Sequence, residues 1–143
     1  MDMLSPEEFD LYDKKWPIRA HSPISVPQHI GETASIAHSI VTEGCVIEGE
    51  LENAILSNSV KVGKGAKVRY SILMQGAEVG EGADVEYAII GENTKIAAGV
   101  KVGEAPGGKA GWGITTVGPD ISIGAGCTVE AGAMIYDSME VAK

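Results

Sequence analysis

The sequence predicts an all-β solenoid, in which short strands wind into three-sided coils. Through the middle of the chain an aliphatic residue recurs at every sixth or fifth position. The 143 residues include 19 glycines, and 5% of the residues are aromatic, which is typical of a β structure with tight corners and a narrow interior. Six residues per side do not fit a helix, whose faces recur every 3.6 residues, but they fit a short strand followed by a corner.

The firmest part of the repeat runs from residue 56 to residue 102. Steps of 6, 6 and 5 residues separate its aliphatic positions, so one coil has 17 residues and three sides. Each coil is expected to stack about 4.8 Å from the next and to cover its apolar interior. The aliphatic positions are Leu56, Val62, Val68, Leu73, Val79, Val85, Ile90, Ile96 and Val102.

The rhythm continues more loosely on both sides of this part, so about six coils fit between residues 30 and 143. A small residue followed by isoleucine recurs at 39–40, 54–55, 71–72 and 88–89, and these spacings of 15, 17 and 17 residues support the same register. The further aliphatic positions are Ile30, Ile36, Val41, Ile47 and Leu51 before the firm part, and Val117, Ile123, Val129 and Ile135 after it.

Charged residues support the register as well, because residues 17 apart come to lie above one another. Opposite signs alternate along the columns that this spacing predicts, and neighbouring charges in such columns attract. Like charges there would disfavour the register. The columns are Lys61, Glu78 and Lys95, then Lys67, Asp84 and Lys101, and a further stacked pair is Tyr70 above Tyr87.

Two segments do not follow the repeat. Residues 1–29 contain four prolines and are predicted to run outside the coils as a linker, with Ser5 as a helix cap. Residues 104–113 interrupt the rhythm between Val102 and Val117 and are predicted to form an inserted loop, with residues 112–117 read as a strand. Insertions in solenoids often lie on a binding face, so this loop is expected to contact a neighbouring subunit or another domain.

The composition excludes several classes of partner. Asp and Glu number 20 against 11 Lys and Arg, a net charge of −9, whereas nucleic acids and anionic membranes attract a basic surface. No apolar run reaches the length of a membrane span and the first residues do not form a signal peptide, so a cytoplasmic protein is expected. Cys45 and Cys127 occupy small inward positions several coils apart, so both are expected to fill the core as free thiols.

The repeating unit resembles the hexapeptide repeat of left-handed parallel β-helices, which implies left-handed coiling. Within that class, SIVTEGCVIEG at 39–49 and ENAIL at 52–56 closely resemble the C-terminal domain of bacterial glucose-1-phosphate adenylyltransferases (ADP-glucose pyrophosphorylases). The segment DLYDKKWPI at 10–18 resembles the place where the catalytic domain of that family joins the β-helix. The resemblance implies a division into residues 1–29, the linker and end of a missing catalytic domain, and residues 30–143, a left-handed β-helix with an inserted loop at 104–113.

This resemblance implies a tetrameric parent enzyme that uses ATP and magnesium to convert glucose 1-phosphate into ADP-glucose and pyrophosphate for glycogen synthesis. The glycine-rich motif of that family's catalytic domain has no match here, so the chain itself is expected to be non-catalytic, without a cofactor or metal. It is expected to supply subunit contacts, contacts with its own catalytic domain and part of an allosteric response. Phosphorylated effectors need convergent cationic groups, and the candidate effector or interface residues are Arg19, Lys109 and Trp112.

Two other families fit the repeat. One is the related non-catalytic subunit that pairs with the enzyme in some bacteria. The other is a stand-alone hexapeptide acyltransferase, a trimer that binds coenzyme A in grooves between coils and uses a histidine as general base. His38 is the histidine on a side of the repeat, but the sequence shows neither a partner to orient it nor an acceptor pocket. Residues 103–110 nearly match a phosphate-binding loop, yet Ala110 stands where that motif needs a hydroxyl.

Overall fold

The computed structural model describes residues 15, 24–107 and 111–140, and this part consists of short parallel strands joined by turns, with no helix. The strands of this part form three sheets of six strands each, here named A, B and C, and each coil contributes one strand to each sheet. Sheet A consists of β1 (His29–Ile30), β4 (Val46–Ile47), β7 (Lys61–Val62), β10 (Glu78–Val79), β13 (Lys95–Ile96) and β16 (Ser122–Ile123). Sheet B consists of β2 (Ser35–Ala37), β5 (Glu50–Glu52), β8 (Lys67–Arg69), β11 (Asp84–Glu86), β14 (Lys101–Val102) and β17 (Thr128–Val129). Sheet C consists of β3 (Ile40–Val41), β6 (Ile55–Leu56), β9 (Ile72–Leu73), β12 (Ala88–Ile90), β15 (Thr115–Val117) and β18 (Met134–Ile135).

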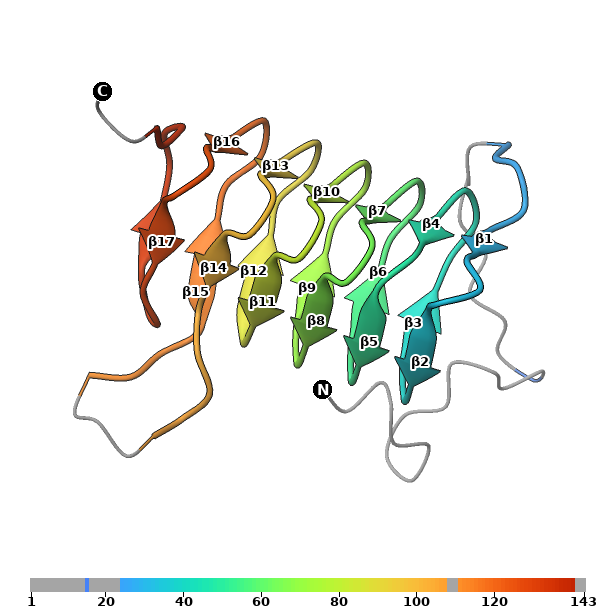
Figure 1. Cartoon of the computed structure of the whole chain (residues 1–143), viewed down its shortest axis with the longest axis horizontal. Coiled ribbons are helices and arrows are strands. Elements are labelled where there is room, and N and C mark those ends of the chain that lie inside the picture. Colours follow the sequence, from blue (N-terminus) through green and yellow to red (C-terminus); the bar gives the residue numbers. More distant parts are fainter. Residues whose placement is uncertain (1–14, 16–23, 108–110, 141–143) are drawn as a thin grey trace.

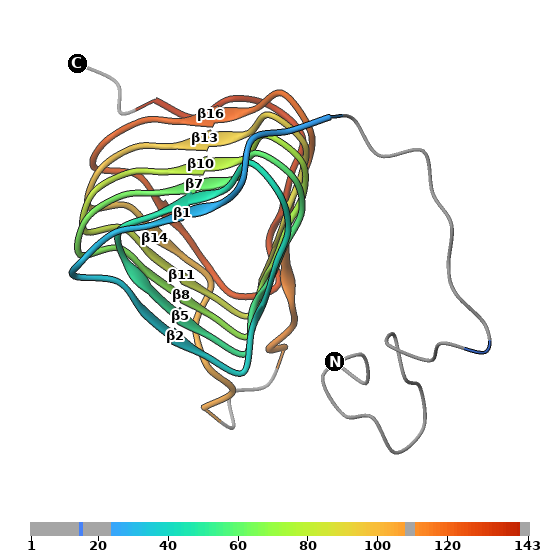
Figure 2. The same cartoon turned by 90° about the vertical axis from the view of Figure 1, so that its right-hand side faces the viewer.

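The three sheets form the sides of a prism with a triangular cross-section (Figures 1 and 2). Figure 2 looks along the axis from the end at which β1 lies, and the chain turns counterclockwise from sheet A to sheet B to sheet C as it recedes. The β-helix is therefore left-handed, which is opposite to the usual crossover between parallel strands. The predicted left-handed parallel β-helix is confirmed, and six strands per sheet agree with the predicted number of coils.

The aliphatic residues of the repeat fill the interior of the prism. From Ile47 to Val129 all the predicted aliphatic positions are at most 3% exposed. The predicted positions at the two ends are less covered: Ile30 and Ile36 are 44% and 39% exposed, and Ile135 is half-buried. In the described part each end coil has a neighbouring coil on one side only, so half of its interior surface stays open.

Strand pairing confirms the 17-residue register. Glu78 pairs with Lys61 on one side and with Lys95 on the other, and Lys61 Nζ lies 3.2 Å from Glu78 Oε1. The rings of Tyr70 and Tyr87 stack as predicted, with 4.8 Å between their centroids. Residues 17 apart therefore occupy equivalent places in successive coils.

The corner between sheets B and C is the tightest, because the five-residue step of the repeat falls there. Successive coils turn this corner through His38, Asn53, Tyr70 and Tyr87, whose φ angles lie between 45° and 49°. Residues other than glycine rarely adopt this left-handed backbone. The corner therefore places a column of side chains, two of them aromatic, along one edge of the prism.

The inserted loop lies at this same corner. Strand β15 begins at Thr115, so the prediction of a strand from residue 112 was wrong for residues 112–114. Trp112 instead donates to Glu104 of the loop and meets Tyr87 of the preceding coil, and the repeat pattern contains neither contact. Among the described residues there is no helix of the length and apolar character needed to cross a membrane.

Candidate functional site

The loop leaves the prism where β14 ends at Val102 and returns where β15 begins at Thr115. Figures 1 and 2 show it projecting from the corner between sheets B and C, toward the end of the solenoid at which β17 lies. Gly103 starts the loop with a φ of 73°, and a Cβ there would collide with the backbone oxygen of Glu86 in the preceding coil. Glycine is therefore required where the chain leaves the repeat.

Two contacts tie the described part of the loop to the preceding coil, and a third joins two residues of the loop. The backbone N–H of Ala105 donates to Glu86 Oε2 at 3.1 Å, and Trp112 Nε1 donates to the backbone oxygen of Glu104 at 2.9 Å. The indole of Trp112 also meets the ring of Tyr87 edge-on, with 5.5 Å between centroids and 80° between planes. Burial, reinforced by neighbouring acidic groups, raises the pKa of the Tyr87 phenol. The aromatic column of the corner therefore continues into the loop.

Arg69 holds the carboxylates of the next coil beside the loop. Its Nη2 donates to both carboxylate oxygens of Asp84, at 2.8 and 3.0 Å, and its Nη1 lies 3.7 Å from Glu86 Oε1. The hydrogen bonds to Asp84 raise the pKa of Arg69 above its ordinary value. In the strand register Asp84 lies between Lys67 and Lys101, as predicted, but its carboxylate binds the guanidinium instead of either lysine. The planar guanidinium offers a fork of donors that an ammonium group lacks.

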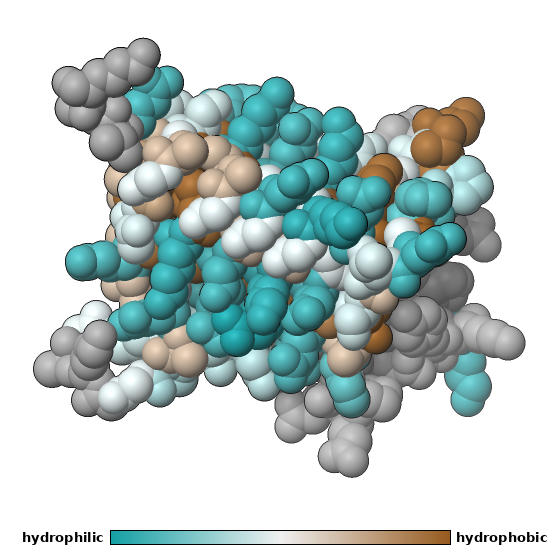
Figure 3. All heavy atoms as spheres, viewed as in Figure 1, coloured by the Kyte–Doolittle hydropathy of each residue, from teal (hydrophilic) through white to brown (hydrophobic). Residues whose placement is uncertain are grey.

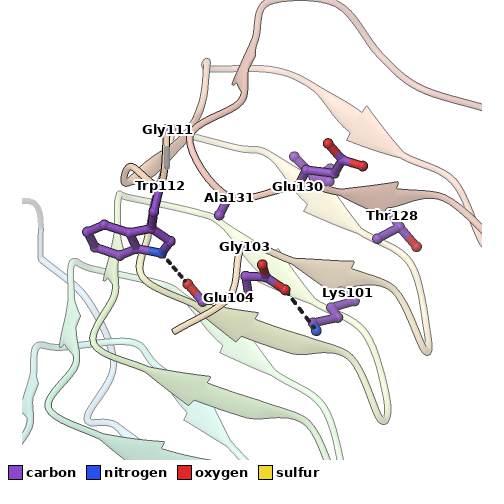
Figure 4. Close-up of a pocket in the computed structure, with 9 residues that line it drawn as sticks. Lys101, Gly103, Glu104, Gly111, Trp112, Thr128, Glu130 and Ala131 are labelled. Atoms are coloured by element: carbon purple, nitrogen blue, oxygen red, sulfur yellow. Dashed lines mark hydrogen bonds and ion pairs between the residues drawn. The ribbon is translucent and has the colours of Figure 1, made fainter. Parts of the chain in front are cut away.

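A cleft of about 440 Å³ lies between the loop and the last coils of sheet B. The cleft opens between the loop on one side and the coil of β17 on the other. Figure 4 shows the indole of Trp112 at one end and Thr128 and Glu130 at the other. The lining residues are Lys101, Gly103, Glu104, Gly111, Trp112, Thr128, Val129, Glu130 and Ala131.

The charges that line the cleft do not fit a phosphate group. Lys101 is the cationic side chain of the described lining, and its Nζ lies 3.9 Å from Glu104 Oε2. Glu130 adds a second carboxylate. Phosphate is bound where cationic donors converge, so two carboxylates beside one paired lysine disfavour an anionic ligand.

Of the three predicted effector or interface residues, Trp112 lines this cleft, whereas Arg19 and Lys109 lie outside the described residues. The predicted effector site therefore stays a prediction, because two of its three residues lie outside the described part of the chain. Sequence reasoning missed Arg69 and Glu86 as neighbours of the loop. Their 17-residue spacing was the available signal, since the two residues pair in adjacent strands.

The described histidines and cysteines do not line the cleft. His38 is exposed at the corner of the first coil, with a φ of 45° and no acidic partner among the described residues. Cys45 is fully buried and Cys127 is half-buried, both are free, and burial raises the pKa of the Cys45 thiol. In the described ranges no three His, Cys, Asp or Glu side chains gather closely enough to hold a metal ion.

Known proteins resemble the chain in sequence over part of its length. It is 42% identical over 73 residues to the glucose-1-phosphate adenylyltransferase of Clostridium beijerinckii, and 46% identical over 70 residues to that of Geobacillus stearothermophilus. These matches cover 50% and 48% of this chain, but 19% and 18% of the relatives. The chain therefore spans about a fifth of the length of the curated relatives it matches.

Solved structures share the fold at lower identity. The acetyltransferase domain of PglB from Neisseria gonorrhoeae superposes with a TM-score of 0.60 and 22% identity, over 81% of this chain and 52% of that one. The GDP-perosamine N-acetyl transferase from Caulobacter crescentus, solved with CoA and GDP-perosamine, gives a TM-score of 0.56 and 17% identity, over 78% and 51% of the two chains. At this identity the likeness shows the fold alone.

The family described as "GlmU-like, C-terminal hexapeptide" matches residues 24–118, which is most of the described solenoid. Its hexapeptide repeat is the one that the buried aliphatic positions and the three parallel sheets display. The chain belongs to the GlmU-like, C-terminal hexapeptide family.

Proposed function

We infer that this chain is the assembly and regulatory domain of a glucose-1-phosphate adenylyltransferase and performs no catalysis by itself. The parent would convert ATP and glucose 1-phosphate into ADP-glucose and pyrophosphate in the cytoplasm, with magnesium, as a homotetramer. The observation that carries this proposal is the identity of 42–46% with adenylyltransferases over half of the chain, against 17–22% with acetyltransferases of the same fold.

The structure supports an assembly role through its rigidity. Three sheets share one continuous apolar interior, so the outer faces of the prism have fixed relative positions. Contacts with Glu86 and Tyr87 hold the described part of the loop against the preceding coil. In the proposal, this loop and Trp112 contact the catalytic domain or a neighbouring subunit. The acidic lining of the cleft supports a protein or hydroxyl-bearing partner over a phosphate.

A hexapeptide acyltransferase is the second candidate, favoured by the names of the two similar solved structures. Such an enzyme needs a general base within reach of its acceptor. His38 lies in the first coil, whereas the cleft lies beside β14 and β17, several coils away. This separation supports the assembly role. The related non-catalytic subunit of glycogen synthesis stays the third candidate, because it shares this domain with the enzyme.

The test is pyrophosphate release from ATP and glucose 1-phosphate, measured for this chain and for the protein encoded by the longer reading frame that the proposal requires. We expect release by the longer protein and none by this chain. If neither protein released pyrophosphate, the proposal that the parent is an adenylyltransferase would be overturned. The non-catalytic subunit or an acyltransferase would then be favoured. Calorimetric titration with coenzyme A then separates these two, because saturable binding is expected of an acyltransferase alone.

A further inference from the structure

Sheet C presents an apolar outer face, whereas sheets A and B present charged ones. Its strands alternate between inward residues and outward residues, and the outward residues pair in one continuous column from the first coil to the last. We name this column the isoleucine face. It consists of Ile40, Ile55, Ile72, Ile89, Thr116 and Met134.

The side chains of the isoleucine face are accessible from outside the prism. Its four isoleucines are half-buried, three of them beside a buried residue of the same strand (Leu56, Leu73 and Ile90), and Met134 is 64% exposed. Met74 and Tyr136, which follow β9 and β18, add apolar surface along one side and are 41% and 74% exposed. The largest apolar patch of a soluble protein is often functional, so we treat this face as an interaction surface.

The other two faces differ sharply in charge. On sheet A the outward column runs through Lys61, Glu78 and Lys95, and sheet B carries two such columns with Lys67 and Asp84 among their members. Figure 3 shows the side on which sheet B faces the viewer, and its surface over the coils is largely hydrophilic. The outward strand positions of sheet C, by contrast, contain no Asp, Glu, Lys or Arg in the described part of the chain.

This distribution of charge favours a second copy of the chain as the occupant of the isoleucine face. The chain has a net charge of −9, so two copies repel one another at long range. The isoleucine face is the described face whose outward strand positions carry no charged side chain. A flat face is covered by one other flat face, and identical faces meet around a twofold axis. We propose that this protein forms a twofold homodimer in which the isoleucine faces of two copies pack together.

The size of the face sets the expected strength of this dimer. Six strands about 4.8 Å apart and about 10 Å wide give roughly 300 Å² per copy, which is less than half of what a standard stable interface contributes from each partner. The dimer is therefore expected to dissociate at micromolar concentrations and not to be permanent. Because its contacts are apolar while the whole molecules repel, added salt should strengthen it by screening the repulsion. A dimer held by ion pairs would respond in the opposite direction.

The proposal deepens the assembly role inferred above, and sedimentation equilibrium of the 143-residue chain tests it without any adenylyltransferase substrate. We expect a monomer–dimer equilibrium between about 5 and 500 µM, with a lower dissociation constant when NaCl rises from about 50 to 500 mM.

In Ile72→Glu, at the centre of the face, dimerisation should weaken about tenfold or more, because the interface would bury two unpaired carboxylates. Val46→Glu is the matched control, since it makes the same kind of change at an outward position of sheet A beside Lys61, and it should dimerise like the parent chain.

A third variant covers the case in which Ile72→Glu fails to fold. The column already contains a threonine, Thr116, so Ile72→Thr is expected to fold. It should weaken the dimer and leave the circular dichroism spectrum unchanged. A monomer at all concentrations, a trimer, or a dimer that Ile72→Glu and Ile72→Thr leave intact would each overturn the proposal. None of these outcomes bears on pyrophosphate release, so failure of the dimer and failure of the proposed function remain distinguishable.

Discussion

The rings of Tyr70 and Tyr87 stack face to face, with 4.8 Å between centroids and 10° between planes, and both residues have a φ of 48°. The centroid distance equals the expected spacing of neighbouring strands, so the coils bring the rings together without adjustment. A left-handed backbone at a bulky residue costs roughly 1–3 kcal/mol, and stacking of the two rings offsets part of this strain energy. The ring of Tyr87 also meets Trp112, which links the corner to the loop.

The stacked pair should show energetic coupling in a double-mutant cycle. Asn53 occupies the same corner one coil earlier with a φ of 49°, so asparagine is the replacement that this backbone accepts. We expect Tyr70→Asn and Tyr87→Asn each to lower the free energy of unfolding, with a coupling of about 0.5–1.5 kcal/mol between them. Urea denaturation of the two single variants and the double variant measures the coupling. Strictly additive effects would show that the rings stack without stabilising one another.

The ion pair of Arg69 with Asp84 should contribute more than the exposed pair of Lys61 with Glu78. Both side chains of the first pair are about a third exposed, whereas Lys61 is 61% exposed. Asp84→Asn removes a charge-assisted, partly buried contact in which Nη2 bonds both carboxylate oxygens, and should cost about 1 kcal/mol of unfolding free energy, and Glu78→Gln less than about 0.5 kcal/mol. Chemical denaturation at low and high salt compares the two. Equal losses would mean that the second hydrogen bond and the partial burial of the Arg69–Asp84 pair add nothing to stability.

Two glycines with similar backbone angles should respond differently to alanine. Gly65 and Gly103 have φ angles of 69° and 73°, but a Cβ on Gly65 meets nothing within 4 Å, whereas one on Gly103 meets the backbone oxygen of Glu86. We expect Gly65→Ala to cost about 1 kcal/mol, from backbone strain alone, and Gly103→Ala clearly more. Thermal denaturation of both variants measures the difference. If Gly103→Ala were the milder change, the loop would have to leave the prism along another path.

The two cysteines should react at different rates. Burial raises the pKa of the Cys45 thiol, so it stays neutral and inaccessible in the folded chain, whereas Cys127 is half-buried. In native buffer at pH 8 a thiol reagent should label Cys127 first, and denaturant should make both labelling rates similar. Mass spectrometry of tryptic peptides identifies the labelled site. Faster labelling of Cys45 would contradict its place in the core.

The raised pKa of Cys45 also gives a pH dependence. In the unfolded chain a thiol ionises near its ordinary pKa of about 8.5, while the folded chain keeps Cys45 protonated to higher pH. The unfolded state therefore loses this proton first, and the free energy of unfolding falls as the pH rises above about 8.5. Cys45→Ala should flatten that part of the pH profile in urea denaturation. If the free energy of unfolding of Cys45→Ala fell with pH as steeply as that of the parent chain, other groups would cause the loss of stability at alkaline pH.

The repeat could be predicted from the sequence because every coil offers the same environment to residues 17 apart. Val62 and Val79 are equivalent for this reason, and so are Tyr70 and Tyr87. The spacing gives the neighbours of a backbone position but not the reach of a long side chain, which is why Arg69 binds Asp84 diagonally and was missed. Trp112 lies outside the repeat, so its position depends on contacts with Tyr87 and Glu104 that no periodicity encodes.

The most direct test of the assembly role is an exchange of the matching segment in a related enzyme. In the Clostridium beijerinckii adenylyltransferase, the 73 residues that match are replaced by those of this chain, and a second version lacks them altogether. We predict that the exchanged enzyme keeps the oligomeric mass and the pyrophosphate release of its parent, and that the shortened enzyme loses the oligomeric mass. An exchanged enzyme with the mass of the shortened one would contradict the account, because this solenoid would then fold without supporting assembly.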